Sequence, residues 1–419
     1  MRRVLSRLAL LTALLAAGAA IAAAETLTNR PPAKITAADP SSLRRGAGLA
    51  AVGDCAVCHT ADDGRPFAGG RPIPTPFGVV YSTNITPEPG AGIGRWSAAD
   101  FRKALRDGVA PGGRQLYPAF PYDHFNKLTD GDIADLYGFL RTRTPVEATP
   151  PPNRLVFPLG FRPLLLGWKL LFLRRAPVGA DPTRPADWNR GRYLVEGLGH
   201  CGACHTPHNR LGAETTSKAF AGGWAEGWYA PPLNAASPAA AAWTTAALET
   251  YLRTGFSAAH AAAAGPMGPV ARDLAEAPPA DVHAIAVYVS SLMGRPNGRA
   301  DDQPDVAAKA HPDGAVLFAG ACAACHGAGA PMMNEGRPNL TLGTPLHEPN
   351  PRDTLQIILQ GLRPPVGRAG PTMPAFAGSF TDAQLGELCA YLRARYAREP
   401  PWPGDLAREA GKARKEKPS

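Results

Sequence analysis

The sequence predicts an all-α protein in which one small helical unit is repeated three times. Three observations lead to this prediction. A five-residue pattern, Cys-x-x-Cys-His, occurs three times, and its copies lie 146 and 121 residues apart. A helix-compatible stretch precedes each copy, and an apolar-periodic helix closes each repeat. The 419 residues are enough for three domains of about 100 residues with connections between them.

The N-terminal residues have the composition of a secretory signal. Three arginines within the first seven residues precede an apolar run, 8–21, which ends in a small-residue cleavage site at 22–24. The run is shorter than the ~20 residues that cross a bilayer, which favours cleavage over a retained anchor. We therefore expect residues 1–24 to be a signal peptide and the mature domains to lie outside the cytoplasmic membrane.

The chain carries a basic excess. Its formal charge of +9 falls to +6 when the three arginines of residues 1–24 are removed, because that stretch has no acidic residue. A basic surface fits contact with anionic lipid or with an acidic partner. The chain has no basic, aromatic-interleaved motif, and export argues against a nucleic-acid partner.

The helices of each repeat are recognised from their caps. The segments 96–108 and 243–255 share Trp, Ser or Thr, Leu, Arg and Gly at matching positions, and 350–361 is a weaker third copy. Ser97 and Thr244 are expected N-caps, and the glycines that end the first two segments are expected C-caps. The closing helices are expected in "LTDGDIADLYGFLRT", "PPADVHAIAVYVSSL" and "FTDAQLGELCAYLRARY".

These elements give the expected organisation of the chain. After the signal peptide come domain 1 (42–145), a linker with an apolar segment (146–186), domain 2 (187–294), a polar linker (295–310), domain 3 (311–397) and a basic C-terminal tail (398–419). We expect this tail to be solvated, with a contact to membrane or a partner as the alternative.

The first linker contains an unusual segment, 155–173, with 13 apolar residues. Two prolines, Arg162 and Lys169 interrupt it, so it is too broken to span a membrane. We expect an interdomain helix packed on the neighbouring domains. A segment that rests on a membrane surface is the alternative.

The repeated pattern has a specific chemistry. Two thiols three positions apart lie on one side of a helical turn, where both can add to the vinyl groups of one haem, and the following histidine then lies beneath the iron. A zinc site would need further ligands at short spacing, and a disulfide framework gives no reason for the histidine. The pattern predicts three class I cytochrome c domains, each with one covalent haem c. Its residues are Cys55, Cys58, His59, Cys201, Cys204, His205, Cys322, Cys325 and His326.

The second axial ligands are expected in the loops before the closing helices. Met267 and Met373 lie in Gly/Pro-bounded loops, 62 and 47 residues after the histidines of the second and third motifs. The first repeat contains no methionine, and Phe120 stands where the other repeats have one. His124 lies in the same loop, so we expect ligation by His59 and His124, with five-coordinate iron or another group as the alternative. Methionine–histidine ligation raises the reduction potential, so the first haem should have the lowest of the three.

Three longer stretches resemble one family over nearly the whole mature chain. "PFGVVYSTNITPEPGAGIGRWSAADF", "LYPAFPYDHF" and "NRGRYLVEGLGHCGACHTPHNRLG" resemble the triple-haem cytochrome c subunit of membrane-bound periplasmic dehydrogenases. The resemblance implies a subunit at the outer face of the cytoplasmic membrane. It would take electrons from a catalytic dehydrogenase and pass them towards ubiquinone or a terminal oxidase.

The type of dehydrogenase depends on Phe120. Alcohol dehydrogenase subunits of this family resemble "LYPAMPY", with methionine at that position. "AFPYDHF" is more similar to cytochrome partners of molybdenum hydroxylases that act on aldehydes or N-heteroaromatics. The resemblance thus implies a molybdenum hydroxylase partner, with a quinoprotein or flavoprotein dehydrogenase as the alternative.

The residues themselves favour electron transfer over catalysis. Iron with histidine and methionine ligands has no open position for a substrate. The chain shows no nucleotide-binding glycine loop and no nucleophile constellation. Two other classes of function are weighed against this prediction. One is a haem enzyme such as a peroxidase that uses an open first haem, and the other is a zinc- or disulfide-stapled binding module.

Overall fold

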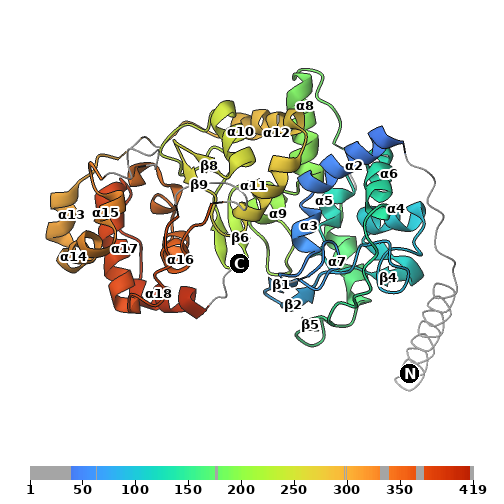
Figure 1. Cartoon of the computed structure of the whole chain (residues 1–419), viewed down its shortest axis with the longest axis horizontal. Helices are drawn as coiled ribbons and strands as arrows, with labels where there is room; N and C mark the ends of the chain where they lie inside the picture. Colours follow the sequence, from blue (N-terminus) through green and yellow to red (C-terminus); the bar gives the residue numbers. More distant parts are fainter. Residues whose placement is uncertain are drawn as a thin grey trace, which may run out of the picture. The chain divides into compact units, whose positions relative to one another are not determined.

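The computed structural model describes residues 39–62, 64–174, 178–296, 298, 300–330, 339–364 and 372–415. The expected signal peptide lies outside the described residues. The chain divides into two compact units. The first holds the residues up to Gly179 together with Glu196–His200, and the second holds Ala180–Val195 and the chain from Cys201 onward. In Figure 1 the first unit runs mainly from blue to green and the second mainly from yellow to red.

The first unit is built around the packing of its first helix on its closing helix. A β-carbon at Gly46 would lie 2.2 Å from the carbonyl oxygen of Asp135, so only glycine allows this approach. Leu49, Leu136 and Leu140 are buried. The helices of this unit are α2 (Pro40–Val52), α3 (Cys55–Cys58), α4 (Ala98–Asp107), η1 (Pro111–Gly113), α5 (Tyr122–Phe125), α6 (Asp130–Arg141) and α7 (Leu164–Phe172).

Two small antiparallel sheets complete the first unit. One has the strand order β1-β2-β5, and Ile73 lies opposite Val80 across its first pair. Gly78 starts the second strand with a φ of 117°, which favours glycine. The strands are β1 (Pro72–Thr75), β2 (Gly78–Tyr81), β5 (Arg154–Leu155) and the hairpin β3 (Val109–Ala110) with β4 (Arg114–Gln115).

The second unit repeats the same helix crossing twice. A β-carbon at Gly191 would lie 1.9 Å from the carbonyl oxygen of Ala284, and one at Gly314 would lie 2.5 Å from that of Glu387. Each of the three Cys-x-x-Cys-His motifs therefore follows a helix that crosses a later helix at a glycine (Figure 1). The close backbone approach fixes how the two helices pack.

The second unit contains the remaining elements. Its helices are α8 (Ala186–Tyr193), α9 (Gly202–His205), η3 (Thr216–Lys218), α10 (Thr245–Thr254), α11 (Met267–Glu276), α12 (Pro279–Leu292), α13 (Pro304–Ala310), α14 (Pro312–Ala321), α15 (Ala323–His326), η5 (Leu340–Leu342), η6 (Thr344–Leu346), α16 (Arg352–Gln360), α17 (Asp382–Tyr396) and α18 (Leu406–Lys415). A π-helical stretch, η2 (Leu194–Leu198), follows α8. Two hairpins join β6 (Gly223–Ala225) with β7 (Trp228–Ala230) and β8 (Phe256–Ser257) with β9 (Ala261–Ala262).

The prediction of an all-α fold of three separate domains is wrong in two respects. About 48% of the described residues are helical, and four small antiparallel sheets accompany the helices. Their strands are two to four residues long, which is too short to leave an alternating pattern in the sequence. The second and third repeats also share one compact unit, in which the backbone N–H of Tyr229 donates to the carboxylate of Asp353 at 2.8 Å.

The segments expected to be a polar linker and a solvated C-terminal tail both contain helices with buried residues. Within the predicted linker 295–310, α13 buries Ala307 completely. Within the predicted tail 398–419, α18 packs on α17, buries Ala410 and Ala413, and pairs Arg414 with Asp382 at 2.8 Å. The buried residues of these helices are alanines that stand among charged residues. The sequence therefore does not show a clear apolar face that would predict their burial.

Among the helices of the described residues, none has both the length and the apolar character that crossing a membrane requires.

Candidate haem sites

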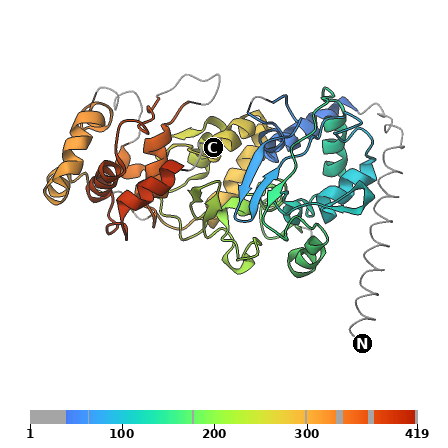
Figure 2. The ribbon, with the colours of Figure 1, turned by 90° about the horizontal axis from the view of Figure 1, so that it is seen from below.

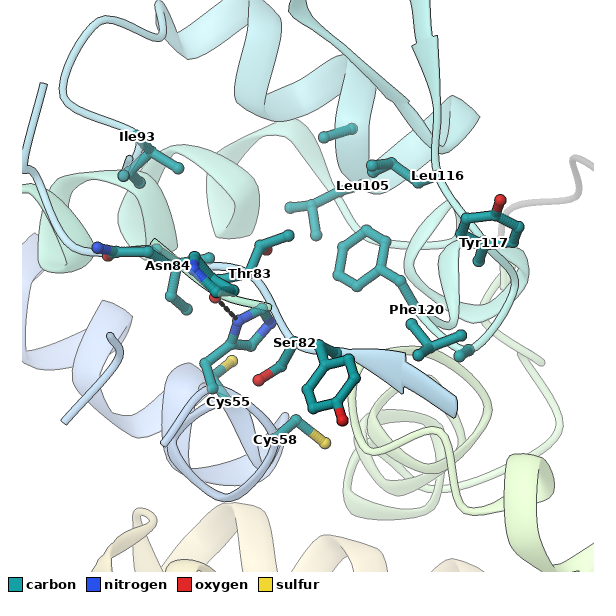
Figure 3. Close-up of a pocket in the computed structure, with 18 of the residues that line it drawn as sticks. Cys55, Cys58, Ser82, Thr83, Asn84, Ile93, Leu105, Leu116, Tyr117 and Phe120 are labelled. Atoms are coloured by element: carbon teal, nitrogen blue, oxygen red, sulfur yellow. Dashed lines mark hydrogen bonds between the residues drawn. The ribbon is translucent and has the colours of Figure 1, made fainter. Parts of the chain in front are cut away.

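The first motif lines a cavity of about 760 Å³ in the first unit. Cys55 and Cys58 begin and end α3, so one helical turn presents both sulfurs to the same space. His59 follows at the end of this turn. Figure 3 shows Leu105, Leu116 and Phe120 among the side chains that surround the same space.

A backbone carbonyl fixes the ring of His59. Its Nδ1 lies 2.6 Å from the carbonyl oxygen of Thr83, the contact drawn as a dashed line in Figure 3. Because a carbonyl only accepts, Nδ1 carries the proton and donates it, which leaves Nε2 unprotonated. Burial lowers the pKa of His59 below its ordinary value, and the Thr83 contact opposes this only in part. The ring is therefore held neutral with a ligand nitrogen available.

The loop after the first motif repeats after the second. In the first loop the N–H of Gly69 donates to the carbonyl of His59 at 2.7 Å, and the N–H of Phe67 donates to the hydroxyl of Thr60 at 3.2 Å. In the second loop Gly222 donates to His205 at 2.9 Å, and the N–H of Phe220 donates to the hydroxyl of Thr206 at 3.1 Å.

His205 is held in the same way as His59. It is buried, its Nδ1 lies 2.6 Å from the carbonyl oxygen of Pro231, and burial lowers its pKa. Its Nε2 is therefore also unprotonated. A β-carbon at Gly223 would lie 2.3 Å from the carbonyl oxygen of Cys204, so the hairpin of β6 and β7 closes directly over the motif.

Met267 and Phe120 occupy equivalent positions, each four residues after a matching backbone hydrogen bond. The backbone N–H of Leu116 donates to the carbonyl oxygen of Gly108 at 2.8 Å. In the second repeat, the backbone N–H of Ala263 donates to the carbonyl oxygen of Gly255 at the same distance. Phe120 follows four residues after Leu116, and Met267 four after Ala263. The two hairpin-and-turn arrangements therefore match, and Phe120 lies on the wall of the first cavity.

The structure does not bring His124 to this cavity. His124 is buried within α5, but it is absent from the described residues that line the cavity of His59. Its Nδ1 lies 2.9 Å from the carbonyl oxygen of Glu196 instead. This arrangement gives no support to His124 as the second ligand, which stays a prediction.

The sequence reasoning did not identify His200, which lines the first cavity. It stands directly before Cys201, has a φ of 35°, and packs its ring edge-to-face with Phe125 at 5.7 Å. Its position next to the second motif is the signal that could have drawn attention to it. In the sequence, His200 is thus the residue that precedes the first cysteine of the second motif.

The third motif lies against the core around α17. Cys322 and Met373 both pack, partly buried, on a cluster that includes Leu388 and Cys389. The backbones of Met373 and Leu362 exchange two hydrogen bonds of 2.9 Å. The structure therefore brings Met373 and the first cysteine of this motif to one apolar cluster. Cys389 is fully buried there.

The donor sets of the first two motifs fit a covalent haem. In the first, two thiols, an imidazole with the correct tautomer and a mainly apolar cavity occur together. In the second, the same imidazole arrangement recurs around His205. His59 and His205 would hold the iron, and the four cysteines would hold the porphyrin.

Two protein-family models match the chain. The cytochrome c model matches residues 43–144, and the model described as cytochrome C oxidase, cbb3-type, subunit III matches residues 309–392. Neither match covers the motif at Cys201. The prediction of three class I cytochrome c domains is therefore not supported, since the family matches cover two. Domains of this kind carry covalently bound haem c.

Several curated proteins are similar over most of the chain. A nicotinate dehydrogenase subunit of Pseudomonas putida is 46% identical over 89% of this chain, which spans only 32% of that protein's length. The fructose dehydrogenase cytochrome subunit of Gluconobacter japonicus is 38% identical over 94% of this chain and 86% of its own length. The cytochrome c subunit of the quinone alcohol dehydrogenase of Gluconobacter oxydans is 32% identical over 87% of this chain and 80% of its own. Together with the haem-binding geometry, these similarities show that the chain belongs to the family of electron-transferring cytochrome c subunits of dehydrogenase complexes.

Proposed function

We propose that the chain carries three covalent haems and transfers electrons from a periplasmic molybdenum hydroxylase towards ubiquinone or a terminal oxidase at the membrane. The proposed number of three haems is supported by a local arrangement at the first motif that recurs at the second motif. A histidine follows two cysteines, and its Nδ1 lies 2.6 Å from a backbone carbonyl, at both His59 and His205. The motif at Cys201 thus has the same local geometry as the first, although no family model covers it.

The residues of the chain have distinct tasks in this proposal. A bound haem supplies a carrier of single electrons. The carbonyls of Thr83 and Pro231 hold the proton on Nδ1 of each histidine, which orients the ring and makes it a better donor. The mainly apolar wall of the first cavity would limit the contact of a bound haem with water. Met267 and Met373 would help to hold the irons of the second and third haems, and methionine ligation would raise the reduction potentials of these haems relative to histidine ligation.

The type of partner is argued from similarity. The chain is 46% identical to a nicotinate dehydrogenase subunit, and nicotinate is an N-heteroaromatic acid. The segment "AFPYDHF" resembles cytochrome partners of molybdenum hydroxylases, and Phe120 stands where the methionine of alcohol dehydrogenase subunits would be. An alcohol or sugar dehydrogenase with quinone or flavin is the alternative, supported by the similarity to the fructose and alcohol dehydrogenase subunits.

Purification of the native complex tests the partner. The chain is isolated with its associated proteins in mild detergent, and metal and cofactor are quantified in the same sample. Stoichiometric molybdenum is the expected result. Bound quinone or flavin without molybdenum would replace the proposed partner with the alternative one, and a chain that oxidises substrate alone would contradict the role of an electron-transfer subunit.

Haem counting tests the second site. The pyridine haemochrome assay and intact mass are expected to give three haems for each chain. A variant with Cys201→Ala and Cys204→Ala should give two. A wild-type value of two, unchanged in the variant, would show that this motif binds no haem.

The first cavity supports a second candidate function. Phe120 lies on its wall where the second loop has Met267, and His124 is not among its described lining residues. An iron without a second ligand there could react with a small molecule such as peroxide. Peroxidase turnover by the isolated holoprotein would favour this function, and its absence would favour electron transfer alone.

A further inference from the structure

A connected group of apolar side chains lies exposed on the first unit. In the part of the chain that the structure describes, eleven large hydrophobic side chains are exposed, and seven of them fall between residues 156 and 171. Phe157 is 98% exposed and Leu170 is 83% exposed. Exposed apolar groups of this size usually mark a contact surface. We call residues 154–174 the outer segment. Its exposed apolar residues are Val156, Phe157, Phe161, Leu164, Leu166, Leu170 and Leu171.

The outer segment turns two of its cations inward, Lys169 within α7 and Arg162 before this helix. The ammonium of Lys169 donates to the carbonyl of Gly108 at 2.7 Å and to the side chain of Gln115 at 2.8 Å. It also lies 4.9 Å from the ring centre of Tyr122. Burial lowers the pKa of Lys169 to about 8. The usual amphipathic arrangement, with charges in water and leucines in the core, is reversed here.

Other contacts fix the same orientation. The guanidinium of Arg162 donates to the carbonyl of Gln115 at 2.5 Å and stacks over Tyr117, 4.6 Å from the ring centre. Leu165 is buried, and Trp168 packs edge-to-face with the ring of Tyr122. α7 is therefore attached firmly to the first unit by one face, and Figure 2 shows it at the edge of this unit. The leucines of the other face point away from the protein because the cations occupy the inner face.

The charges around the outer segment indicate what covers it. Residues 148–180 contain five basic and no acidic residues. Exposed Arg154 and Arg174 lie at its two ends. An apolar ridge between cations, with phenylalanines at 157 and 161, matches a lipid interface with anionic headgroups. There the side chains enter the acyl boundary and the cations meet phosphate.

We propose that the outer segment is a lipid-docking surface that lies in the plane of an anionic membrane interface without crossing it. This inference rests on the proposed function, because a membrane acceptor requires the chain to stay near the bilayer. The nine residues of α7 are far too few to span, whereas side-on contact needs only one exposed face.

Vesicle sedimentation tests this surface with the full holoprotein. The probes are phosphatidylcholine vesicles with and without phosphatidylglycerol. The wild-type chain is expected to bind the anionic vesicles more tightly. The variant with Phe157→Glu and Leu170→Glu should bind at least about tenfold more weakly, because both side chains lose apolar contact and repel the headgroups. Both positions are so exposed that the fold is expected to persist, which circular dichroism and haem content check.

Control variants separate lipid docking from a general charge effect. Val316→Glu changes an apolar residue of α14 that is 72% exposed, and it should bind vesicles like the wild type. Arg154→Gln with Arg174→Gln should lower binding to anionic vesicles only.

Two results would overturn the inference. They are no binding by the wild type, and equal vesicle binding by the wild type and the F157E/L170E variant. If the variant bound vesicles equally but no longer assembled with the dehydrogenase, the segment would be assigned to a protein contact. Haem content and co-purification of the dehydrogenase are measured on the same samples, so failure of the lipid surface leaves the proposed function standing.

Discussion

At the residue scale, the difference between Phe120 and Met267 has a measurable consequence. The two residues occupy equivalent positions in the two repeats. Each lies four residues after the donor of a 2.8 Å backbone hydrogen bond, which is Leu116 in the first repeat and Ala263 in the second. We expect Phe120→Met to give the first haem a thioether ligand and to raise its reduction potential. The ferric haem should gain the near-infrared band of methionine ligation, and carbon monoxide should no longer bind the reduced first haem.

The reverse substitution is the matched control. Met267→Phe should remove the methionine band of the second haem and create a site for carbon monoxide there. An F120M variant with an unchanged spectrum and potential would show that the first loop does not reach the iron. The two sites would then differ in ligation because of the geometry of their loops, not because of the identity of one side chain.

His124 provides a separate test at the residue scale. Its ring lies at the carbonyl of Glu196, 2.9 Å away, and it is not among the described residues that line the first cavity. His124→Ala is therefore expected to leave the axial-ligand spectrum of the first haem unchanged, as measured by electron paramagnetic resonance. A change from low-spin to high-spin iron would instead establish the bis-histidine ligation that the sequence suggests.

At the element scale, the helix crossings limit which residues are tolerated. A β-carbon at Gly46 would meet the carbonyl oxygen of Asp135 at 2.2 Å and Cβ of Phe139 at 2.8 Å. Because both neighbours belong to backbone or its first side-chain atom, neither can move aside alone. Gly46→Ala should lower the free energy of unfolding of the first unit by roughly 1–3 kcal/mol, measured by denaturant titration.

Gly167 gives the matched control for this substitution. It lies inside α7, where a β-carbon would meet no atom within 4 Å. Gly167→Ala should be neutral or should stabilise by about 0.4–1 kcal/mol, since it restricts the unfolded chain. Equal effects of the two alanines would contradict the tight crossing.

The sequence predicted the helices better than the loops. Ser97 and Thr244 cap α4 and α10, and Gly108 and Gly255 end them in the left-handed region, as predicted. Such caps act within one turn, so a single sequence reveals them. The loops that hold His59 and His205 were not predicted, although both contain Phe-Ala-Gly-Gly, at 67–70 and 220–223. This repeat lies at different distances from the two motifs, so a fixed spacing does not reveal it.

At the scale of the whole molecule, the grouping of the repeats into compact units was harder to predict, because it depends on contacts between residues that are far apart in the sequence. The second and third motifs belong to one compact unit, and one link between them is the hydrogen bond from Tyr229 to Asp353. These residues are more than a hundred positions apart, and a lone aspartate in a helix gives no sign of such a partner. The inward cations of the outer segment are a similar case, because Lys169 of α7 and Arg162, which precedes this helix, look in the sequence like interruptions of an apolar helix.

The link between the two halves of the second unit should make its stability depend on pH. Asp353 is buried beside the fully buried Glu348, and burial raises the pKa of Asp353 from its ordinary 3.8 to about 7. Burial and the charge of Asp353 together raise the pKa of Glu348 well above its ordinary value. The folded chain then holds protons that the unfolded chain releases. The contribution of this pair to the free energy of unfolding is therefore largest in acid and falls as the pH rises from about 4 through 7.

Asp353→Asn tests this dependence. The new amide keeps an oxygen that can accept the N–H of Tyr229, but it cannot ionise, so the fall in stability between about pH 4 and pH 7 should become shallower. The variant should be more stable than the wild type above pH 7, measured by denaturant titration of the holoprotein at each pH. Asp301→Asn removes an exposed carboxylate and should leave the slope as it is. If D353N kept the wild-type slope, or if stability rose over this range, the buried carboxyl pair would not be protonated in the folded chain. Its charge would then have to be balanced within the second unit, where Arg393 already donates to the backbone carbonyl of Glu348.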